Sequence, residues 1–344
     1  MARHKGKSPL HLACLGKGKK GKKGKMNISE YLKQNIIGQS HVISEVLPYV
    51  NLFHAGLSSK NRPVGVLVLA GETGTGKTYF AQQLAQALHG SDSYLLRVDC
   101  AEYAQDHETA RLIGAPPGYL GHRETKPLIT QAKLNSITSV TSSLSVVLFD
   151  EIEKASEKLR QLLLGIFDYG KLSLGDSTSV DFHNTLVLMT TNLGAKQIQE
   201  SRLPFGFTQT QNDVKSLAQK AVNKFFSPEF LNRIDKTIVF NSLTQEDFDS
   251  IVALEIAKVF EQIENRNPQI KLTIDDEFVT KLQLKCKANS FGGREVKRFL
   301  VNELLVPLAE KVLESIAKRQ PTIYHLTYEN GLVIESKKRF KAGI

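Results

Sequence analysis

A glycine-rich turn between a strand-like run and a helix-like run constrains this chain more than any other stretch. Residues 64–70 are apolar and include several β-branched side chains, which is typical of a short, buried parallel strand. Apolar residues then recur at helical spacing at Phe80, Leu84 and Leu88. Between the two runs, residues 71–78 read G-E-T-G-T-G-K-T, the pattern of a Walker A loop. This order predicts a strand, a phosphate-binding turn and a helix in succession.

The residue types in this loop suit a nucleotide. Gly71, Gly74 and Gly76 let backbone N–H groups curl around phosphate oxygens, and the N-terminus of the next helix adds its positive dipole end. Lys77 is placed to neutralise the β- and γ-phosphates, and Thr78 offers a hydroxyl to Mg²⁺. The alternative is a tight turn that holds no ligand. We expect ATP and Mg²⁺ to bind at Gly71, Glu72, Thr73, Gly74, Thr75, Gly76, Lys77 and Thr78.

A second strand-like run ends in two carboxylates. Residues 145–149 are largely apolar and lead directly into Asp150 and Glu151, which predicts a Walker B motif. Asp150 is expected to hold Mg²⁺ together with Thr78, and Glu151 to orient and polarise the attacking water. The alternative is that the acidic pair only caps the following helix. The chain contains no N-K-x-D motif for reading guanine, which disfavours a GTPase.

Strand-like and helix-like runs alternate up to about residue 240. The strand-like runs lie at 64–70, 94–99, 146–149 and 186–190, and helical segments follow residues 77, 125 and 157 and cover 213–226. Strands separated by helices predict a parallel sheet covered on both faces. The chain then becomes mainly helical, with a capping box at Thr244 and Asp247, helical segments at 275–287 and 294–318, and a hairpin signal at Asn330-Gly331.

The expected fold is therefore α/β, followed by a small α-rich domain that ends in a β-hairpin. We expect three parts: a basic disordered tail at 1–26, an ATPase core at 27–241 and a small C-terminal domain at 242–340.

The net charge of +10 is concentrated at the N-terminus. Residues 1–25 hold nine of the 45 Lys and Arg residues and no acid, so the remainder carries 36 basic against 35 acidic residues. A near-neutral remainder disfavours a DNA-tracking surface on the ATPase. The Lys/Gly run at 16–25 is expected to be disordered; the alternatives to a solvated linker are a nuclear address, a mitochondrial presequence and a nucleic-acid arm. Residues 8–13 (S-P-L-H-L-A) resemble part of an ankyrin repeat.

Cysteine usage and hydropathy indicate the compartment. Cys14, Cys100 and Cys286 are far apart and form no C-x-x-C pair, which fits a reducing environment. No apolar run approaches the length of a membrane span, and residues 1–25 lack the apolar core of a secretory signal. We expect a soluble cytoplasmic protein, with the mitochondrial matrix as the alternative.

Motifs spread over residues 26–334 resemble the Clp-type AAA+ ATPases, most closely the second ATPase domain of the ClpB disaggregase. The segments that carry this resemblance are 36–39 (I-I-G-Q), 55–57, 61–63, 111–121 (R-L-I-G-A-P-P-G-Y-L-G), 191–194 (T-N-L-G), 228–235 (P-E-F-L-N-R-I-D) and 291–295 (F-G-G-R-E). The resemblance implies an AAA+ parallel sheet, a lid-type small domain and a hexameric ring.

The same resemblance assigns roles to five residues. It implies that Ile36 and Ile37 lie on the adenine side of the nucleotide, and that Asn192 is the polar residue of sensor 1. It also implies that Arg233 is an arginine finger supplied to a neighbouring subunit, and that Arg294 is the sensor-2 cation. From the residues alone, Asn192 could equally be a turn residue and Arg233 a surface ion-pair partner.

Tyr119 lies in the segment similar to the family's substrate-gripping pore loop. The resemblance implies a loop formed by Gly118, Tyr119, Leu120 and Gly121. The alternative is that Tyr119 packs its loop against the domain. Two departures stand beside the match: residues 171–181 lack the arginine common in the family's second pore loop, and 203–207 (L-P-F-G-F) only approximate a peptidase-docking loop.

We expect an ATP-driven protein unfoldase or disaggregase that threads unfolded or aggregated clients through a homo-oligomeric ring. A co-chaperone or a peptidase is a further candidate partner. One alternative is a regulatory unfoldase for a separate peptidase. Another is a DNA-linked AAA+ motor, which the charge distribution disfavours, and a third is a non-hydrolysing scaffold, which the presence of Glu151 and Arg233 disfavours. Nucleic acid is expected only at the basic tail, and a membrane is not an expected partner.

Overall fold

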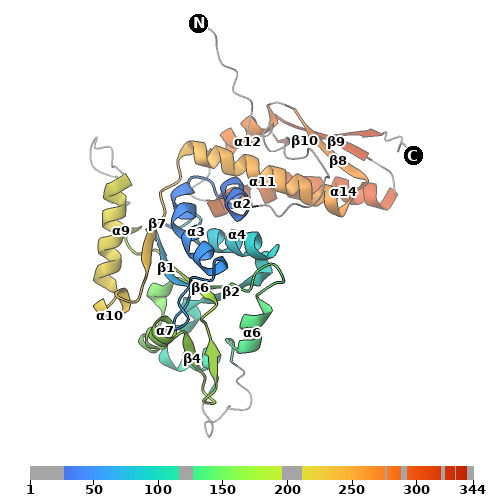
Figure 1. Cartoon of the computed structure of the whole chain (residues 1–344). Helices are drawn as coiled ribbons and strands as arrows, with labels where there is room; N and C mark the ends of the chain where they lie inside the picture. The colour runs from blue at the N-terminus through green and yellow to red at the C-terminus, as the bar shows by residue number, and fades with distance from the viewer. Residues whose placement is uncertain are drawn as a thin grey trace. The chain divides into compact units, whose positions relative to one another are not determined.

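The computed structural model describes residues 27–115, 127–195, 211–275, 277–287, 293–318, 322–329 and 331–338, without the side chains of residues 211–213, 294, 318, 337 and 338. The chain forms two compact units (Figure 1). One extends to Ser242, and the other begins at Leu243.

A parallel sheet forms the centre of the first unit. Within the described residues it has five strands in the order β2 (Leu95–Asp99), β3 (Ser145–Asp150), β6 (Thr185–Thr191), β1 (Gly65–Ala70) and β7 (Lys236–Val239). The register of β1 on β6 runs from Gly65 opposite Leu186 to Ala70 opposite Thr191. Because the strands are parallel, the carboxyl ends of β1, β3 and β6 meet at one edge, where ligands of such sheets bind. The predicted parallel sheet is confirmed.

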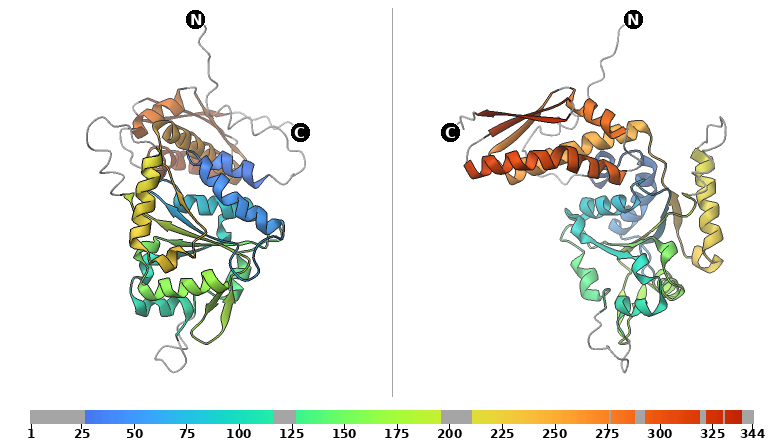
Figure 2. Two further views of the ribbon diagram at one scale, coloured as in Figure 1. Left: turned by 60° about the vertical axis from the view of Figure 1, so that its left-hand side comes forward. Right: turned by 180° about the vertical axis from the view of Figure 1, so that it is seen from behind.

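Alternate residues of β1 face two separate hydrophobic cores. Val66, Val68 and Ala70 lie in one core, together with apolar side chains of α7 and α9. Leu67 and Leu69 lie in the other, together with apolar side chains of α2, α3 and α4. Helices therefore cover both faces of the sheet (Figure 2). The helices of this unit are α2 (Ile28–Asn35), α3 (Ser40–His54), α4 (Lys77–His89), α5 (Thr109–Ile113), α6 (Gln131–Ser136), α7 (Glu157–Tyr169), α9 (Gln211–Phe225) and α10 (Pro228–Leu231).

The second unit combines helices with a small sheet. Its helices are α11 (Gln245–Arg266), α12 (Phe278–Lys287), α13 (Gly293–Leu300) and α14 (Val306–Lys318). Its described strands are β8 (Ile270–Ile274), β9 (Thr322–Tyr328) and β10 (Leu332–Lys338), in the order β10-β9-β8. The capping box predicted at Thr244 and Asp247 starts α11, and the predicted terminal hairpin is the antiparallel pair β9–β10.

Four of the described strands were not predicted from the sequence. Strand β7 has only four residues and begins with polar Lys236 and Thr237, so its apolar pattern is short. Strand β8 pairs in parallel with β9, far along the chain. The short antiparallel pair β4 (Lys171–Ser173) and β5 (Ser179–Asp181) follows α7. In addition, the helix predicted over 294–318 is divided by a π-helical segment at Val301–Leu305.

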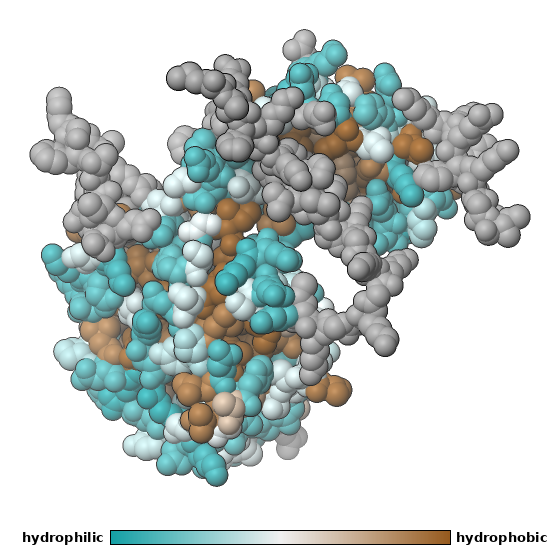
Figure 3. Space-filling model, turned by 45° about the horizontal axis from the view of Figure 1, so that its top comes forward, coloured by the Kyte–Doolittle hydropathy of each residue, from teal (hydrophilic) through white to brown (hydrophobic). Residues whose placement is uncertain are grey.

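Hydrophilic and apolar side chains alternate over the face of the molecule in Figure 3. Within the described part of the chain, no helix has the length and apolar character required to cross a membrane.

Candidate nucleotide-binding site

The Walker A residues form a turn at the carboxyl end of β1. Gly71, Gly74 and Gly76 all have positive φ angles, of 145°, 84° and 99°, a region that L side chains rarely adopt. At Gly71 a Cβ would also lie 3.0 Å from the Phe240 carbonyl oxygen, so the backbones approach too closely for a side chain. At Gly76 no atom lies within 4 Å of a built Cβ, so the backbone there faces open space. Helix α4 begins at the next residue, so the positive end of its dipole lies at that turn.

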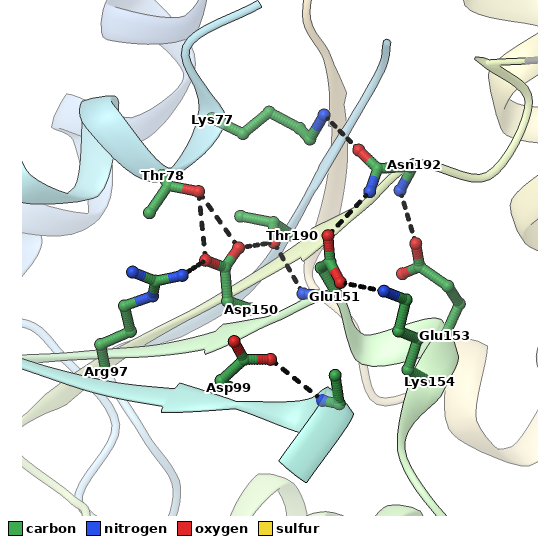
Figure 4. A network of polar contacts seen from close by, with 11 residues as sticks. Lys77, Thr78, Arg97, Asp99, Asp150, Glu151, Glu153, Lys154, Thr190 and Asn192 are labelled. Carbon is green, nitrogen blue, oxygen red and sulfur yellow. Dashed lines mark hydrogen bonds and ion pairs between the residues drawn. The ribbon is translucent and has the colours of Figure 1, made fainter. Parts of the chain in front are cut away.

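Lys77 lies at the centre of this turn. Its ammonium donates to the carbonyl oxygens of Gly71 and Glu72, each at 2.8 Å, and to Asn192 Oδ1 at 2.9 Å (Figure 4). Only 7% of Lys77 is exposed. The Walker A cation and the predicted sensor-1 amide, which are far apart in sequence, are therefore in direct contact.

The Asp150 carboxylate accepts from three side chains. Thr78 Oγ1 lies 3.1 and 3.2 Å from its two oxygens, and Thr190 Oγ1 donates to Oδ1. Arg97, on the adjacent strand β2, places Nη2 2.7 Å from Oδ2 (Figure 4). Because the Thr78 hydroxyl directs its proton at Asp150, the lone pairs of that oxygen remain free to bind a cation.

Glu151 lies in a backbone turn immediately after β3. It has φ 57°, in the left-handed region, and its N–H donates to Thr190 Oγ1 at 3.0 Å. Its carboxylate is 2.5 Å from Lys154 Nζ, and Asn192 Nδ2 approaches it at 3.5 Å. Hydrogen bonding and the charge of Glu151 raise the pKa of Lys154. The predicted catalytic carboxylate thus points at the same amide that contacts Lys77.

Glu153 extends this network beneath Asn192. One carboxylate oxygen accepts from the Asn192 backbone N–H at 3.0 Å, which fixes the turn that carries the amide. The other oxygen is buried and has no hydrogen-bond partner within the described residues. A buried polar atom left unsatisfied is unusual and often marks a place where a ligand or water completes the site.

The segment before α3 contacts the nucleotide loop through Gln39. Its amide, 2% exposed, donates to Asn241 O at 2.8 Å and to Thr75 O at 3.4 Å, and its oxygen accepts from Asn241 N at 3.0 Å. Ile36 is buried and Ile37 is half-buried in the same segment. The Glu72 carboxylate accepts from Ser242 Oγ at 2.6 Å. Both ends of the first unit are therefore tied to the Walker A turn.

Arg233 lies near the amino end of β1, whereas this site lies at the carboxyl end of that strand. It pairs with Asp168 at 2.5 Å and with Glu229, through Nη1 to the carbonyl oxygen at 2.9 Å and Nη2 to the carboxylate at 3.5 Å. Two residues later, Asp235 bonds to Val66 at the start of β1. The Walker A turn follows the other end of that strand, about 13 Å away at roughly 3.3 Å per residue. The chain therefore does not bring Arg233 to its own nucleotide loop.

Other predicted residues cannot be placed in the site. Arg294 belongs to the first turn of α13, and its side chain lies outside the described atoms. The predicted pore loop at 118–121, the segment at 203–207 and the basic tail all lie outside the described residues.

The structure adds site residues that sequence reasoning missed. Arg97, Lys154 and Thr190 each contact a Walker B carboxylate, and Glu153 supports Asn192. Only Thr190 carried a signal, because it is the last residue of the predicted strand-like run at 186–190, just before the sensor-1 motif. Arg97 lies in the middle of the strand-like run at 94–99, between apolar Leu96 and Val98, but nothing in the sequence indicated its partner.

Cys100 lies near the same carboxylates, but its thiol is not activated. Burial, followed by the charges of Asp99 and Asp150, raises the pKa of its thiol, so it stays protonated at neutral pH. Among the described residues, no group of three or more His, Cys, Asp or Glu side chains could hold a metal without other ligands. Mg²⁺ is usually held by one or two protein groups together with phosphates and water, so a site for it does not require such a group.

Two family models match this chain. Residues 62–237 match the model described as AAA domain (Cdc48 subfamily), and residues 243–324 match that described as the C-terminal, D2-small domain of ClpB protein. The chain therefore belongs to the AAA ATPase family, whose loop of this type binds a nucleotide. Within that family, its small domain is of the ClpB second-domain type.

Similar proteins and solved structures are of the same ClpB and Hsp104 kind. The chain is 36% identical over 288 residues to a chaperone protein ClpB of Mesorhizobium japonicum, covering 84% of this chain and 32% of that protein. It is 32% identical over 309 residues to heat shock protein 104 of Schizosaccharomyces pombe, covering 90% and 33%. The chain thus spans about a third of the length of these curated relatives.

A closed-state structure of Hsp104 with ATPγS and FITC casein shares 28% identity with a TM-score of 0.73, over 90% of this chain and 51% of that one. An extended-conformation complex of S. cerevisiae Hsp104 with casein shares 25% identity with a TM-score of 0.76, over 95% and 56%.

Proposed function

We propose that this chain is an ATP-driven protein unfoldase or disaggregase of the ClpB type. The observation that carries the proposal is the continuous contact from Lys77 through Asn192 to Glu151, three residues from three different segments. A phosphate-binding cation, a polar sensor and a carboxylate base within one network are what phosphoryl transfer to water requires. The names of the relatives, ClpB and Hsp104, support the client class.

The residues present fit ATP with Mg²⁺. The proposed nucleotide residues are Ile36, Ile37, Gly71, Glu72, Thr73, Gly74, Thr75, Gly76, Lys77, Thr78 and Asp150. The glycine backbone and the α4 N-terminus would hold the phosphates, and Thr78 and Asp150 would hold the metal. When bound, Mg²⁺ supplies charge neutralisation on the β- and γ-phosphates.

Glu151 is the proposed base for the attacking water. In the structure one of its carboxylate oxygens is paired with Lys154, so this cation competes with the attacking water for the carboxylate. Asn192 would orient that water or the terminal phosphate from the other side. Lys77 must likewise leave the loop carbonyl groups to meet the phosphates.

We propose a ring of identical subunits because Arg233 lies near the amino end of β1, away from the nucleotide loop of its own chain. An arginine supplied by a neighbouring copy would stabilise the charge of the transition state. Arg233 must first leave Asp168, which holds it in the single chain. We propose a homo-oligomer, by analogy with the family a hexamer, in which Arg294 contributes the sensor-2 cation. We also propose the division into a tail at 1–26, a core at 27–241 and a lid at 242–340.

Protein clients are the proposed substrates, and Tyr119 between Gly118 and Leu120-Gly121 is the proposed grip. Both Hsp104 structures are complexes with casein, which supports a polypeptide substrate. A co-chaperone or a peptidase is a further proposed partner. We also propose a cytoplasmic location.

Two substitutions test the site. Lys77→Ala should lose ATP binding, whereas Glu151→Gln should keep binding and lose turnover by orders of magnitude, since the water loses its base. Equilibrium binding of a labelled ATP analogue and steady-state phosphate release measure the two effects. Native turnover in Glu151→Gln would refute the assignment.

A further inference from the structure

An arginine contacts the buried carboxylate that the proposed metal site needs. Arg97 Nη2 lies 2.7 Å from Asp150 Oδ2, and the side chain of Asp150 is 5% exposed whereas that of Arg97 is 44% exposed. The two come from neighbouring strands, β2 and β3. Figure 4 shows the guanidinium approaching the carboxylate beside Thr78.

The hydrogen bonds of Asp150 leave little room for another donor. Thr190 donates to Oδ1, the single proton of Thr78 goes to either oxygen, and Arg97 occupies Oδ2. A carboxylate offers about four lone-pair positions, so about one remains for a water in the shell of a metal ion. The carboxylate is therefore already charge-balanced and oriented within the chain itself.

We propose that the charge of Arg97, held against Asp150, lowers the affinity of the proposed site for Mg²⁺, while the hydroxyls of Thr78 and Thr190 also orient the carboxylate. The inference rests on the proposed function. A buried carboxylate is costly without a partner, and an arginine stays charged at every physiological pH. The same positive charge repels a divalent cation that must approach this carboxylate, and repulsion between near charges is strong in a partly buried site.

This proposal and a purely structural role for Arg97 predict opposite changes in Mg²⁺ affinity when Arg97 is replaced. If Arg97 only held Asp150 in place, its removal would misplace the carboxylate and weaken Mg²⁺ binding. If its charge also opposes the metal, its removal leaves Thr78 and Thr190 to orient Asp150, and Mg²⁺ binds more tightly. Because the Arg97 side chain is 44% exposed, its loss opens no closed cavity.

The test measures the free Mg²⁺ concentration at half-maximal binding of a fluorescent, non-hydrolysable ATP analogue. It compares the full chain with Arg97→Gln and Arg97→Met, two neutral variants of similar length, and with Arg97→Lys, which keeps the charge. Arg160→Gln is the matched control, because it removes one arginine charge from a pair with Glu157 on α7. We expect the midpoint to fall about three- to tenfold in both neutral variants and to stay native in Arg97→Lys and Arg160→Gln.

A midpoint that is unchanged or higher in both neutral variants overturns the proposal. Failure of both to fold also overturns it, because Arg97 would then be a structural residue; thermal melting without nucleotide checks this. If the unsubstituted chain itself shows no Mg²⁺-dependent binding, the proposed function fails instead, and the two failures are thereby distinguished.

Discussion

Thr190 links the two Walker B carboxylates, so replacing it with the near-isosteric Val should affect both stability and turnover. Its hydroxyl donates to Asp150 and accepts from the Glu151 N–H at 3.0 Å, and Thr190 itself is 1% exposed. The substitution keeps the shape of the side chain and removes only this hydroxyl. It leaves the Glu151 N–H without an acceptor in the turn that aims the proposed base.

The expected loss follows from these two contacts. Leaving this partly buried donor unsatisfied costs about 1–3 kcal/mol in the free energy of unfolding. For a unit of this size, each kcal/mol lowers the melting temperature by about 2–4 °C. Turnover should fall by about ten- to a hundredfold, because a base displaced by an ångström loses its alignment with the water.

Thr190→Ser is the matched control, since it keeps the hydroxyl and loses one methyl group, at about 1 kcal/mol. Urea denaturation and steady-state phosphate release on both variants measure the two quantities. The reasoning would be refuted if a folded Thr190→Val turned over ATP at the native rate, or if Thr190→Ser lost as much turnover as Thr190→Val.

The remaining predictions address the ion pairs and the proposed grip. Lys154→Met should raise basal turnover, because it releases Glu151 from its ion pair, and a fall in the rate would contradict this. The pKa of Lys154 is raised, so the pair is fully formed below the ordinary lysine value of about 10.4 and is lost only as pH rises through the raised pKa. Arg233→Ala subunits mixed into native protein should lower turnover more than in proportion to their fraction, and a strictly proportional fall would reject the neighbour's role. Asp168→Asn, which releases Arg233, should raise turnover at limiting protein concentration, and an unchanged rate in the same phosphate-release assay would argue against the pair as a restraint. Tyr119→Ala should keep most ATPase and lose client unfolding while Tyr119→Phe keeps both; joint loss of both activities with a lowered melting temperature in Tyr119→Ala would favour a packing role.

The sheet could be predicted because its signals are local. Each of β1, β3 and β6 is a short run buried at every position, and the turn after β1 needs glycines at fixed spacing. Strand β7 could not be predicted, because its pairing with β1 is stabilised by the register of distant residues, such as Val66 with Asp235. Strand β8 similarly depends on β9.

Part of the candidate site could be predicted for the same reason. Asp150 ends β3 and Glu151 follows it, whereas Lys77 and Thr78 begin α4 after the turn that follows β1. Their convergence follows because the carboxyl ends of parallel strands lie side by side. The Arg97–Asp150 and Glu151–Lys154 pairs could not be predicted, because they depend on side-chain direction rather than on spacing along the chain.

The central claim is that ATP turnover at Glu151 drives protein unfolding, and one measurement tests it most directly. A folded, fluorescent client protein is followed with the full chain and with Glu151→Gln, each with ATP and with a non-hydrolysable analogue. The account predicts loss of client fluorescence only for the unsubstituted chain with ATP, and client binding without unfolding in the other three mixtures. Unfolding at the native rate by Glu151→Gln, or with the analogue, would contradict it.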